Sequence, residues 1–320
     1  MFRKFKLVLL GVLCICTLLY LSKKLIYPSS SDVTYIPIGK GGTFGDVKVF
    51  VNPVDDGKVT LEDIFISVRT SRKFHESRID PIVKTWFNLA REQTYIFTDG
   101  DDDKLNETTG GHVINTHCGR DYNRSHLSCK TGTVYDTYLA SGKKWWCRFD
   151  DDNYVNPRRV VHLVNGYNWT QDICIGKLSV PFFTTDYHGH SEIYQFAHGG
   201  AGCCISRPLA LKMKPWCGRE ELVVTTREAG MQEDCALGFI ITNRLKINLT
   251  LTDLLHSTRE SLEDLNPDTL HEQASIGQSP GNTVNLDKVK NVKIFNHDVD
   301  PTRFITLHCF LFPTANICKI

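Results

Sequence analysis

Apolar and polar positions alternate between strand-like and helix-like patterns from residue 62 onward. Residues 64–68 form a short apolar run rich in branched side chains, which is typical of a strand buried on both faces. Apolar residues then recur at helical spacing over residues 79–90, and residues 95–98 form a second apolar run that ends at Asp99-Gly100. This order predicts a βαβ unit in an α/β domain, and therefore a mainly parallel, twisted sheet flanked by helices.

The middle of the chain continues the alternation. Residues 134–140 predict a helix and residues 144–149 predict a strand. Pro157 can open the next helix, because proline is well tolerated at the first helical position. Between that strand and that helix lie three consecutive carboxylates, Asp150 to Asp152. Ligands of open parallel sheets bind outside the carboxyl ends of the strands, which is where this triplet falls.

Three neighbouring carboxylates repel one another unless something offsets their charge. A hard divalent cation such as Mg²⁺ or Mn²⁺ suits them, because it takes one or two protein carboxylates and completes its shell with phosphate oxygens and water. The alternative is an acidic turn at the N-terminal end of the helix that Pro157 opens. A second triplet, Asp101 to Asp103, lies in a polar stretch without a helical pattern behind it, and we expect a solvated turn there.

The N-terminal residues predict a membrane anchor. Residues 7–21 carry no charge and have Lys and Arg on both sides. No convincing small-residue cleavage site follows, which favours a signal anchor with a cytoplasmic N-terminus over the alternative of a cleaved signal peptide. The expected division is a cytoplasmic tail over 1–6, a signal-anchor helix over 7–25, a stem over 26–57 and a lumenal domain over 58–320.

The charge and the cysteines favour a lumenal domain that does not bind nucleic acid. Residues 1–27 hold five of the 37 Lys and Arg residues and no acid, so the remainder carries 32 against 36 Asp and Glu. Nucleic-acid binding depends on clustered basic residues, so a mildly acidic body argues against that class. Ten cysteines lie beyond residue 27 without zinc-site spacing, which favours disulfides. Glycosylation sequons begin at Asn106, Asn123, Asn168 and Asn248.

Several motifs, in one order, resemble those of the Fringe glycosyltransferases. Residues 145–156, Trp-Trp-Cys-Arg-Phe-Asp-Asp-Asp-Asn-Tyr-Val-Asn, are very similar to the family's signature. Further similar segments are 63–68, 74–78, 95–99, 199–207, 209–213, 300–304 and 308–309. The resemblance covers roughly residues 60–320 and is highly specific.

The resemblance implies a GT-A nucleotide-sugar-binding fold in a single-pass type II Golgi membrane protein, which cleavage in the stem could also release. It implies an inverting transfer of N-acetylglucosamine from UDP-GlcNAc, in β1,3 linkage, to O-linked fucose on EGF-like repeats of Notch-type receptors. Mn²⁺ would be the cofactor, and modulation of Notch signalling would be the biological result.

The resemblance also implies roles for individual residues. Arg78 and Asp151 would bind the donor, Asp152 would bind the metal ion, and Asp234 would be the general base that takes the acceptor's hydroxyl proton. The family's disulfides correspond to Cys118–Cys129, Cys147–Cys204 and Cys309–Cys318, which leaves Cys174, Cys203, Cys217 and Cys235 without an assigned partner.

One departure from the family concerns the metal site. The family has a His-x-His in its C-terminal third, whose second histidine is its metal ligand, whereas the two positions here are His256 and Thr258. Either His256 takes over the coordination, or the cation keeps an additional water, or catalysis is impaired. Glu233 also stands where the family has Asp.

Two other functions stay open on the sequence. The first is another inverting β1,3-glycosyltransferase of similar build, with a donor such as UDP-galactose, because carboxylates that face a diphosphate do not reveal the sugar. The second is a lumenal glycan-binding protein without catalysis, which Thr258 supports. A metallohydrolase is disfavoured, because the sequence shows no evident second cluster of His and Asp ligands.

Overall fold

A seven-stranded sheet forms the centre of the structure, a computed structural model that describes residues 57–287, 289 and 294–319. These residues belong to one unit of the chain, Asp55–Ile320. The expected cytoplasmic tail and signal anchor, and all but the last residue of the expected stem, lie outside the described residues. Within the described part of the chain, no helix combines the length and the apolarity needed to cross a membrane.

The large sheet is mainly parallel, as the sequence predicts. Its strands, in spatial order, are β10 (Thr250–Leu251), β6 (Cys174–Gly176), β9 (Cys203–Ser206), β4 (Trp145–Asp150), β1 (Ile64–Arg69), β2 (Thr94–Thr98) and β3 (Val113–Asn115). Strands β4, β1, β2 and β3 run parallel, as do β10 and β6, whereas β9 runs antiparallel to both of its neighbours. The antiparallel strand is not among the elements that the sequence pattern predicts.

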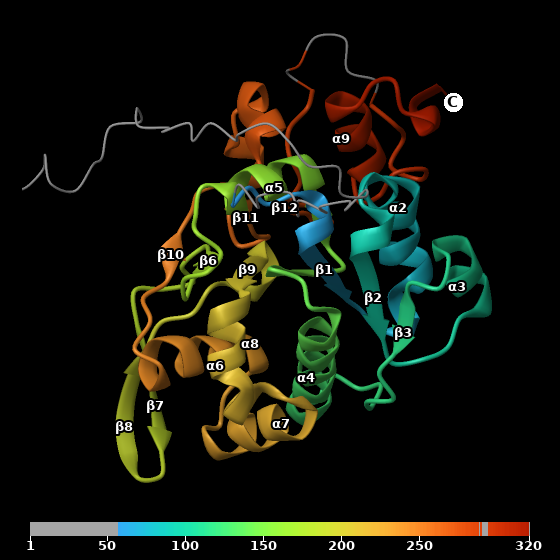
Figure 1. Cartoon of the computed structure of the whole chain (residues 1–320). Helices are drawn as coiled ribbons and strands as arrows, with labels where there is room; N and C mark the ends of the chain where they lie inside the picture. The colour runs from blue at the N-terminus through green and yellow to red at the C-terminus, as the bar shows by residue number, and fades with distance from the viewer. Residues whose placement is uncertain (1–56, 288, 290–293, 320) are drawn as a thin grey trace, which may run out of the picture. The chain divides into compact units, whose positions relative to one another are not determined.

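Helices cover both faces of this sheet, and its central strands are therefore almost wholly buried (Figure 1). Alternate residues of β1 enter two apolar cores: Ile64, Ile66 and Val68 pack into one, and Phe65 packs into the other. The helices are α2 (Asp80–Lys84), α3 (Asp103–Thr109), α4 (Arg124–Ser141), α5 (Pro157–Asn165), α6 (Arg207–Cys217), α7 (Arg219–Glu228), α8 (Glu233–Gly238) and α9 (Phe304–Leu311). Side chains of α5 and α9 belong to the first core, and those of α4, α6 and α7 belong to the second.

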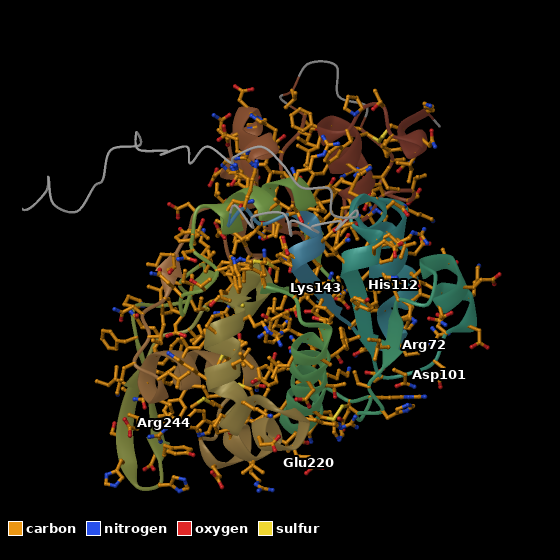
Figure 2. The ribbon with its side chains drawn as sticks, in the orientation of Figure 1. Arg72, Asp101, His112, Lys143, Glu220 and Arg244 are labelled. Atoms are coloured by element: carbon orange, nitrogen blue, oxygen red, sulfur yellow. A yellow bond between two sulfur atoms is a disulfide. The ribbon has the colours of Figure 1, made fainter. Side chains whose placement is uncertain are left out.

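Two smaller sheets complete the strands of the described residues. One has the order β11 (Leu255–His256), β12 (Ser275–Gly277) and β5 (Asn153–Val155), and β5 begins directly after the aspartate triplet. The other is the hairpin of β7 (Phe183–Tyr187) and β8 (His190–Tyr194), where the Arg244 guanidinium lies 4.4 Å from the centre of the Tyr187 ring (Figure 2).

Short 3₁₀ and π turns connect many of these elements. The 3₁₀ turns are η1 (Leu61–Asp63), η2 (Arg72–Phe74), η4 (Trp86–Leu89), η5 (Arg91–Gln93), η6 (Gly199–Ala201), η8 (Leu262–Asp264), η9 (Pro267–Glu272) and η10 (Asn316–Lys319), and the π turns are η3 (His75–Ile79) and η7 (Phe239–Arg244).

The helix predicted over residues 79–90 is broken in the structure. The π turn η3, α2 and the 3₁₀ turn η4 replace it, with the break at Thr85 (φ −118°, ψ −109°). The amide of Thr85 donates to the carbonyl of Ile82 at 3.1 Å rather than to that of Pro81, which accepts the Thr85 hydroxyl at 2.6 Å, so the α-helical hydrogen-bond pattern ends there. Ile82, Val83 and Trp86 are nevertheless buried, which explains why the apolar spacing looked helical.

Two other local expectations need correction. Asp101 to Asp103 do not form only a solvated turn: Asp102 is the N-cap of α3, its Oδ1 accepts from the amide of Leu105 at 3.0 Å, and its Oδ2 lies 2.9 Å from His75 Nδ1. The helix predicted over 134–140 begins ten residues earlier, at Arg124, because Asn123 caps it. Cys129 therefore lies inside α4.

The structure contains the three disulfides that the family resemblance implies: Cys118–Cys129, Cys147–Cys204 and Cys309–Cys318. The second joins β4 to the antiparallel β9, and Cys147 lies three residues before Asp150, the first aspartate of the triplet. Cys174, Cys203, Cys217 and Cys235 are free cysteines.

Removing the Cys147–Cys204 disulfide should destabilise the fold more than removing Cys309–Cys318. The two bonds close segments with sequence separations of 57 and 9, so the entropy of loop closure predicts losses of about 4 and about 2.5 kcal/mol in the free energy of unfolding. Guanidinium unfolding of the two paired Cys→Ala variants measures both values, and equal losses would contradict the expected order.

Candidate functional site

The aspartate triplet lies at the carboxyl end of β4, beside the carboxyl end of β1. Asp150 is paired in the sheet register with Arg69, the last residue of β1. A cavity of about 150 Å³ opens at this edge, and its lining comes from residues 69–78, 122–130 and 150–152. The sequence therefore placed the triplet correctly, at an open edge where parallel strands end.

Asp151 is buried and holds an arginine at the cavity. Its Oδ1 accepts from Arg78 Nη1 at 2.7 Å, and its Oδ2 accepts from the Thr70 hydroxyl at 2.6 Å. Burial raises the pKa of Asp151, although Arg78 and Thr70 oppose that shift. The guanidinium of Arg78 also lies 4.0 Å from the centre of the Phe74 ring, yet its side chain stays 40% exposed. Arg78 thus keeps part of its donor set available for an anionic ligand in the cavity.

Asp152 presents a carboxylate oxygen with no partner within the described residues. Its Oδ1 is buried and accepts no hydrogen bond there. Burial, and after it the charges of Asp150 and Asp151, raise the pKa of Asp152 to about 7. A buried carboxylate that is charged and has no partner destabilises the fold unless a cation offsets its charge. One carboxylate with room for phosphate oxygens and water fits the way Mg²⁺ and Mn²⁺ bind at nucleotide sites.

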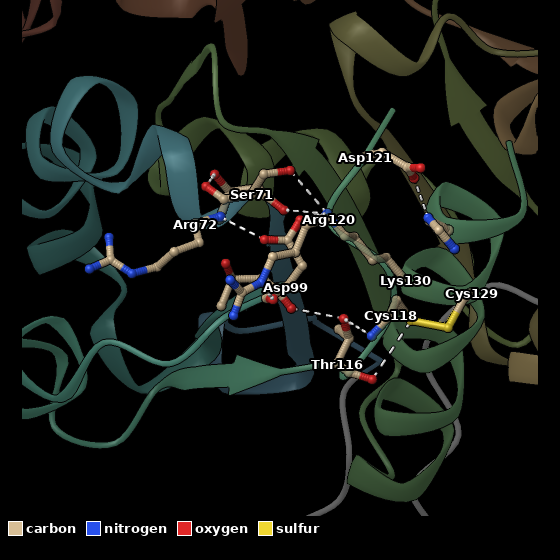
Figure 3. A network of polar contacts seen from close by, with 12 residues as sticks. Ser71, Arg72, Asp99, Thr116, Cys118, Arg120, Asp121, Cys129 and Lys130 are labelled. Atoms are coloured by element: carbon tan, nitrogen blue, oxygen red, sulfur yellow. Dashed lines mark hydrogen bonds and ion pairs between the residues drawn. A yellow bond between two sulfur atoms is a disulfide. The ribbon is translucent and has the colours of Figure 1, made fainter. Parts of the chain in front are cut away.

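Lys130, which also lines the cavity, forms a buried ion pair with Asp99 (Figure 3). Lys130 Nζ donates to Asp99 Oδ2 at 2.5 Å, to the carbonyl of Thr70 at 3.1 Å and to the Ser71 hydroxyl at 3.0 Å. The side chains of Lys130 and Asp99 are each only 1% exposed. The ammonium thus joins the segment of Thr70 and Ser71, to which two of its contacts go, to Asp99 at the end of β2, and Thr70 is the residue that donates to Asp151.

Asp234 lies on a different element, as the second residue of α8. It is half-buried, and its Oδ1 accepts from the amide of Cys235 at 2.8 Å. Gly199 makes room for it, because a Cβ at Gly199 would stand 3.2 Å from Asp234 Oδ2. Arg78, Asp151 and Asp152 line one cavity together, whereas Asp234 borders a separate small cavity with Arg148 and Cys203.

His256 is buried and both of its ring nitrogens have partners. Nδ1 lies 3.0 Å from Glu260 Oε2, and Nε2 lies 2.9 Å from Gln273 Oε1. The carbonyl of Thr258 accepts from Asn282 Nδ2 at 2.6 Å. Within the residues that the structure describes, no three His, Cys, Asp or Glu side chains are arranged to hold a metal ion. Of the two metal ligands considered from the sequence, Asp152 and His256, only Asp152 keeps a buried side-chain atom without a partner in the described residues.

All four asparagines of the predicted glycosylation sequons are exposed. Asn106 lies in α3, and Asn123 caps α4. Asn168 accepts from both the amide and the hydroxyl of Thr170 in a tight turn, and Asn248 precedes β10.

Three residues of the site were not found from the sequence: Arg69, Thr70 and Lys130. Arg69 and Thr70 directly follow a buried apolar run, and a polar residue at such a strand end is the signal that could have pointed to them. Lys130 had no such signal, because a lysine on an amphipathic helix is usually exposed.

Fold and site together define a class: a mixed α/β protein whose acidic cluster lies at the carboxyl edge of a mainly parallel sheet. The Fringe-like family model matches residues 59–315. The chain is 41% identical to the beta-1,3-N-acetylglucosaminyltransferase lunatic fringe of Danio rerio, over 83% of this chain and 72% of the relative. It is 40% identical to the beta-1,3-N-acetylglucosaminyltransferase radical fringe of Gallus gallus, over 81% of this chain and 71% of the relative. It is 42% identical to the Fringe glycosyltransferase of Drosophila melanogaster, over 81% of this chain and 64% of the relative.

The protein belongs to the Fringe-like family, which confirms the resemblance of its motifs. Among solved structures, a glycosyltransferase involved in glycosylation of the major capsid of PBCV-1 aligns with a TM-score of 0.37 and 9% identity, over 67% of this chain and 92% of that chain.

Proposed function

We propose that this protein is an inverting glycosyltransferase that moves N-acetylglucosamine from UDP-GlcNAc, in β1,3 linkage, to O-linked fucose on EGF-like repeats of Notch-type proteins. Its relatives are named beta-1,3-N-acetylglucosaminyltransferases, which supports the reaction and the sugar. The observation that carries the proposal is an oxygen of Asp152 that has no partner among the described residues, in the same cavity as the partly exposed guanidinium of Arg78. Together they offer a cation anchor and an anion contact at one strand edge, as a nucleoside diphosphate requires.

On the donor side, the side chains position a diphosphate. We assign Asp152 as the protein ligand of Mn²⁺, with His256 or a water completing the shell, and Arg78 as a direct contact to the donor. When bound, the cation would act as a Lewis acid that stabilises charge on the departing UDP. Asp151 holds Arg78 at the cavity through their 2.7 Å contact, and Thr70 holds Asp151. The supporting strands β1 and β4 belong to what we interpret as a GT-A nucleotide-sugar fold.

On the acceptor side, the reaction needs only one carboxylate, which acts as the general base. Inversion in a single displacement needs a base that takes the proton of the attacking fucose hydroxyl as its oxygen bonds to the anomeric carbon. We assign this role to Asp234. Its half-buried position, outside the cavity that the triplet lines, suits a group that faces the acceptor rather than the diphosphate.

The raised pKa of Asp152 gives the proposed cation site a pH dependence. A cation needs the charged carboxylate, so we expect the Kd for Mn²⁺ to rise about tenfold per pH unit below about pH 7 and to level off above it. Calorimetry with UDP-GlcNAc, whose phosphates do not titrate in this range, measures the dependence from pH 5.5 to 8. An affinity that stays constant over this range would contradict the assignment of Asp152.

The proposed compartment is the Golgi membrane, with a type II topology and a lumenal catalytic domain that modulates Notch signalling. Its support is the uncharged segment over 7–21 and the sequons and disulfides of the body. Protease protection of a tagged full-length chain in sealed Golgi vesicles tests the topology.

The decisive test of function is sugar transfer by the full-length, detergent-solubilised protein. The acceptor is an O-fucosylated EGF-like repeat, with the unfucosylated repeat as its matched control, and UDP-GlcNAc, UDP-galactose and UDP-glucose are compared with Mn²⁺ or EDTA. We expect transfer from UDP-GlcNAc to the fucosylated repeat alone, with Mn²⁺. Transfer from UDP-galactose instead would identify a different β1,3-glycosyltransferase.

A glycan-binding protein without turnover is the second candidate function. The two hydrogen-bond partners of His256 and the threonine at position 258 favour it, because they leave Asp152 as the main anchor for a cation. Binding of the fucosylated repeat without release of UDP would support this alternative and exclude the transferase.

A further inference from the structure

A network of buried ion pairs joins the aspartate triplet to the helix that carries Asp234. Arg69 Nη2 donates to Asp150 Oδ1 at 2.9 Å, and Arg69 Nη1 donates to the carboxylate of Glu233, the first residue of α8. The same Nη1 also donates to the Thr131 hydroxyl at 3.1 Å. One guanidinium thus bridges two carboxylates that belong to segments 83 positions apart in the chain.

The bridge lies in the interior. The side chains of Arg69, Asp150 and Glu233 are 16%, 24% and 5% exposed. A second cation, Arg148, lies 3.7 Å from Glu233. Although burial opposes the shift, Arg69 and Arg148 lower the pKa of Glu233, which therefore keeps its charge. Separating a buried, charged carboxylate from its cation strongly destabilises the folded protein, so we expect the ion pair between Arg69 and Glu233 to persist.

Each carboxylate of the bridge is close in sequence to an aspartate with a proposed functional role. Asp150 stands two residues before Asp152, and Glu233 stands one residue before Asp234. A guanidinium is a planar fork with fixed donor directions, so it sets the separation of the two carboxylates that it binds. Because each carboxylate belongs to the backbone segment of a proposed functional aspartate, the fork also sets how the first turn of α8 lies against the end of β4.

We propose that Arg69 and Glu233 are positioning residues for sugar transfer, and that the bridge Asp150–Arg69–Glu233 holds Asp234 at its working position relative to a donor bound at the triplet. Neither residue is assigned a contact with substrate. The inference rests on the proposed function, because it needs a transfer reaction whose donor and base lie on these two segments. A base displaced by about 1 Å can lose a factor of about 100 in rate, which is the size of effect expected when the bridge is broken.

The test separates turnover from donor binding in the full-length protein. We expect Glu233→Gln to lower kcat by about 10- to 100-fold at saturating donor, because the amide keeps the shape but loses the charge that Arg69 holds. The Kd for UDP with Mn²⁺ should change less than about threefold, since Arg69 and Asp150 stay paired. Glu233→Asp keeps the charge and should recover most of kcat. Lys212→Met, which breaks the exposed ion pair of Lys212 with Asp172, is the matched control and should leave both values unchanged.

Arg69→Lys provides a second variant should Glu233→Gln fail to fold. It keeps the positive charge but cannot bridge two carboxylates as a rigid fork, and we expect the same loss of kcat with donor binding retained. Unchanged kcat in the folded variants would overturn the inference, and so would parallel losses of kcat, UDP binding and thermal stability, which indicate a structural role only. Absence of transfer by the unaltered protein would instead refute the proposed function, so the two failures are distinguishable.

Discussion

In the Asp152→Ala variant we expect Mn²⁺-dependent binding of UDP to weaken by about 100-fold or more, a loss of about 2.7 kcal/mol. The cation loses its protein anchor, and the diphosphate then loses the counter-charge that offsets Asp150 and Asp151. The unpartnered oxygen of Asp152 within the described residues is the basis for this size of effect. Calorimetric titration of UDP with Mn²⁺, and again with EDTA, measures it.

Two further variants separate this loss from unfolding. Asp152→Asn preserves shape and removes a buried charge, so without Mn²⁺ its thermal stability should equal or exceed that of the unaltered protein. Asp103→Ala changes an exposed aspartate of the other triplet and should leave UDP binding intact. If Asp152→Ala still bound UDP tightly with Mn²⁺, the cation would have to be held elsewhere, and the assignment of Asp152 would be wrong.

The Asp234→Asn variant should lose turnover but keep UDP binding, in contrast to Asp152→Ala. Turnover should fall by about 10²- to 10⁴-fold, the usual contribution of a general base, because the amide cannot take the proton of the acceptor hydroxyl. Binding of UDP should stay within about threefold, since Asp234 does not line the cavity of the triplet. Initial rates with radiolabelled donor, together with the UDP titration, measure the two quantities independently.

Glu220→Gln, an exposed change on the neighbouring helix α7, is the matched control for Asp234→Asn. It should alter neither rate nor binding. Loss of UDP binding in Asp234→Asn would place this carboxylate on the donor side, and full turnover would move the base to another residue. Either result would break the division of roles between the end of β4 and the start of α8.

Much of the donor side could be predicted because it is local in the chain. Residues 64–68, 95–98 and 144–149 carry enough apolar periodicity to predict β1, β2 and β4, and the triplet follows β4 directly. A strand end followed by a proline-initiated helix is a pattern within about 15 residues, so no distant contact is needed to recognise it. The family motifs lie in the same segments, and the match over residues 59–315 confirms them.

Errors arose where side chains compete with the backbone or where contacts are distant. The apolar spacing over 79–90 is compatible with a helix, and only the structure shows that the helix breaks at Thr85, whose amide donates to the carbonyl of Ile82. The cap that Asp102 provides for α3 was missed because its weakly apolar helix lacks a periodic pattern. Strand β9 has only four residues, and its antiparallel place between β4 and β6 depends on partners far along the chain.

By itself, the sequence determined the class of fold, the position of the acidic triplet and the family, because all of these depend on motifs and periodicity within short segments. Only the tertiary structure decided which groups meet. It showed that Asp151 holds Arg78, that Asp152 keeps a buried oxygen without a partner in the described residues, and that Arg69 joins Asp150 to Glu233, which lie 83 positions apart in the sequence. The physical reason is that charge pairing and burial depend on distance in space, and sequence spacing does not encode that distance once strands from separate segments pair.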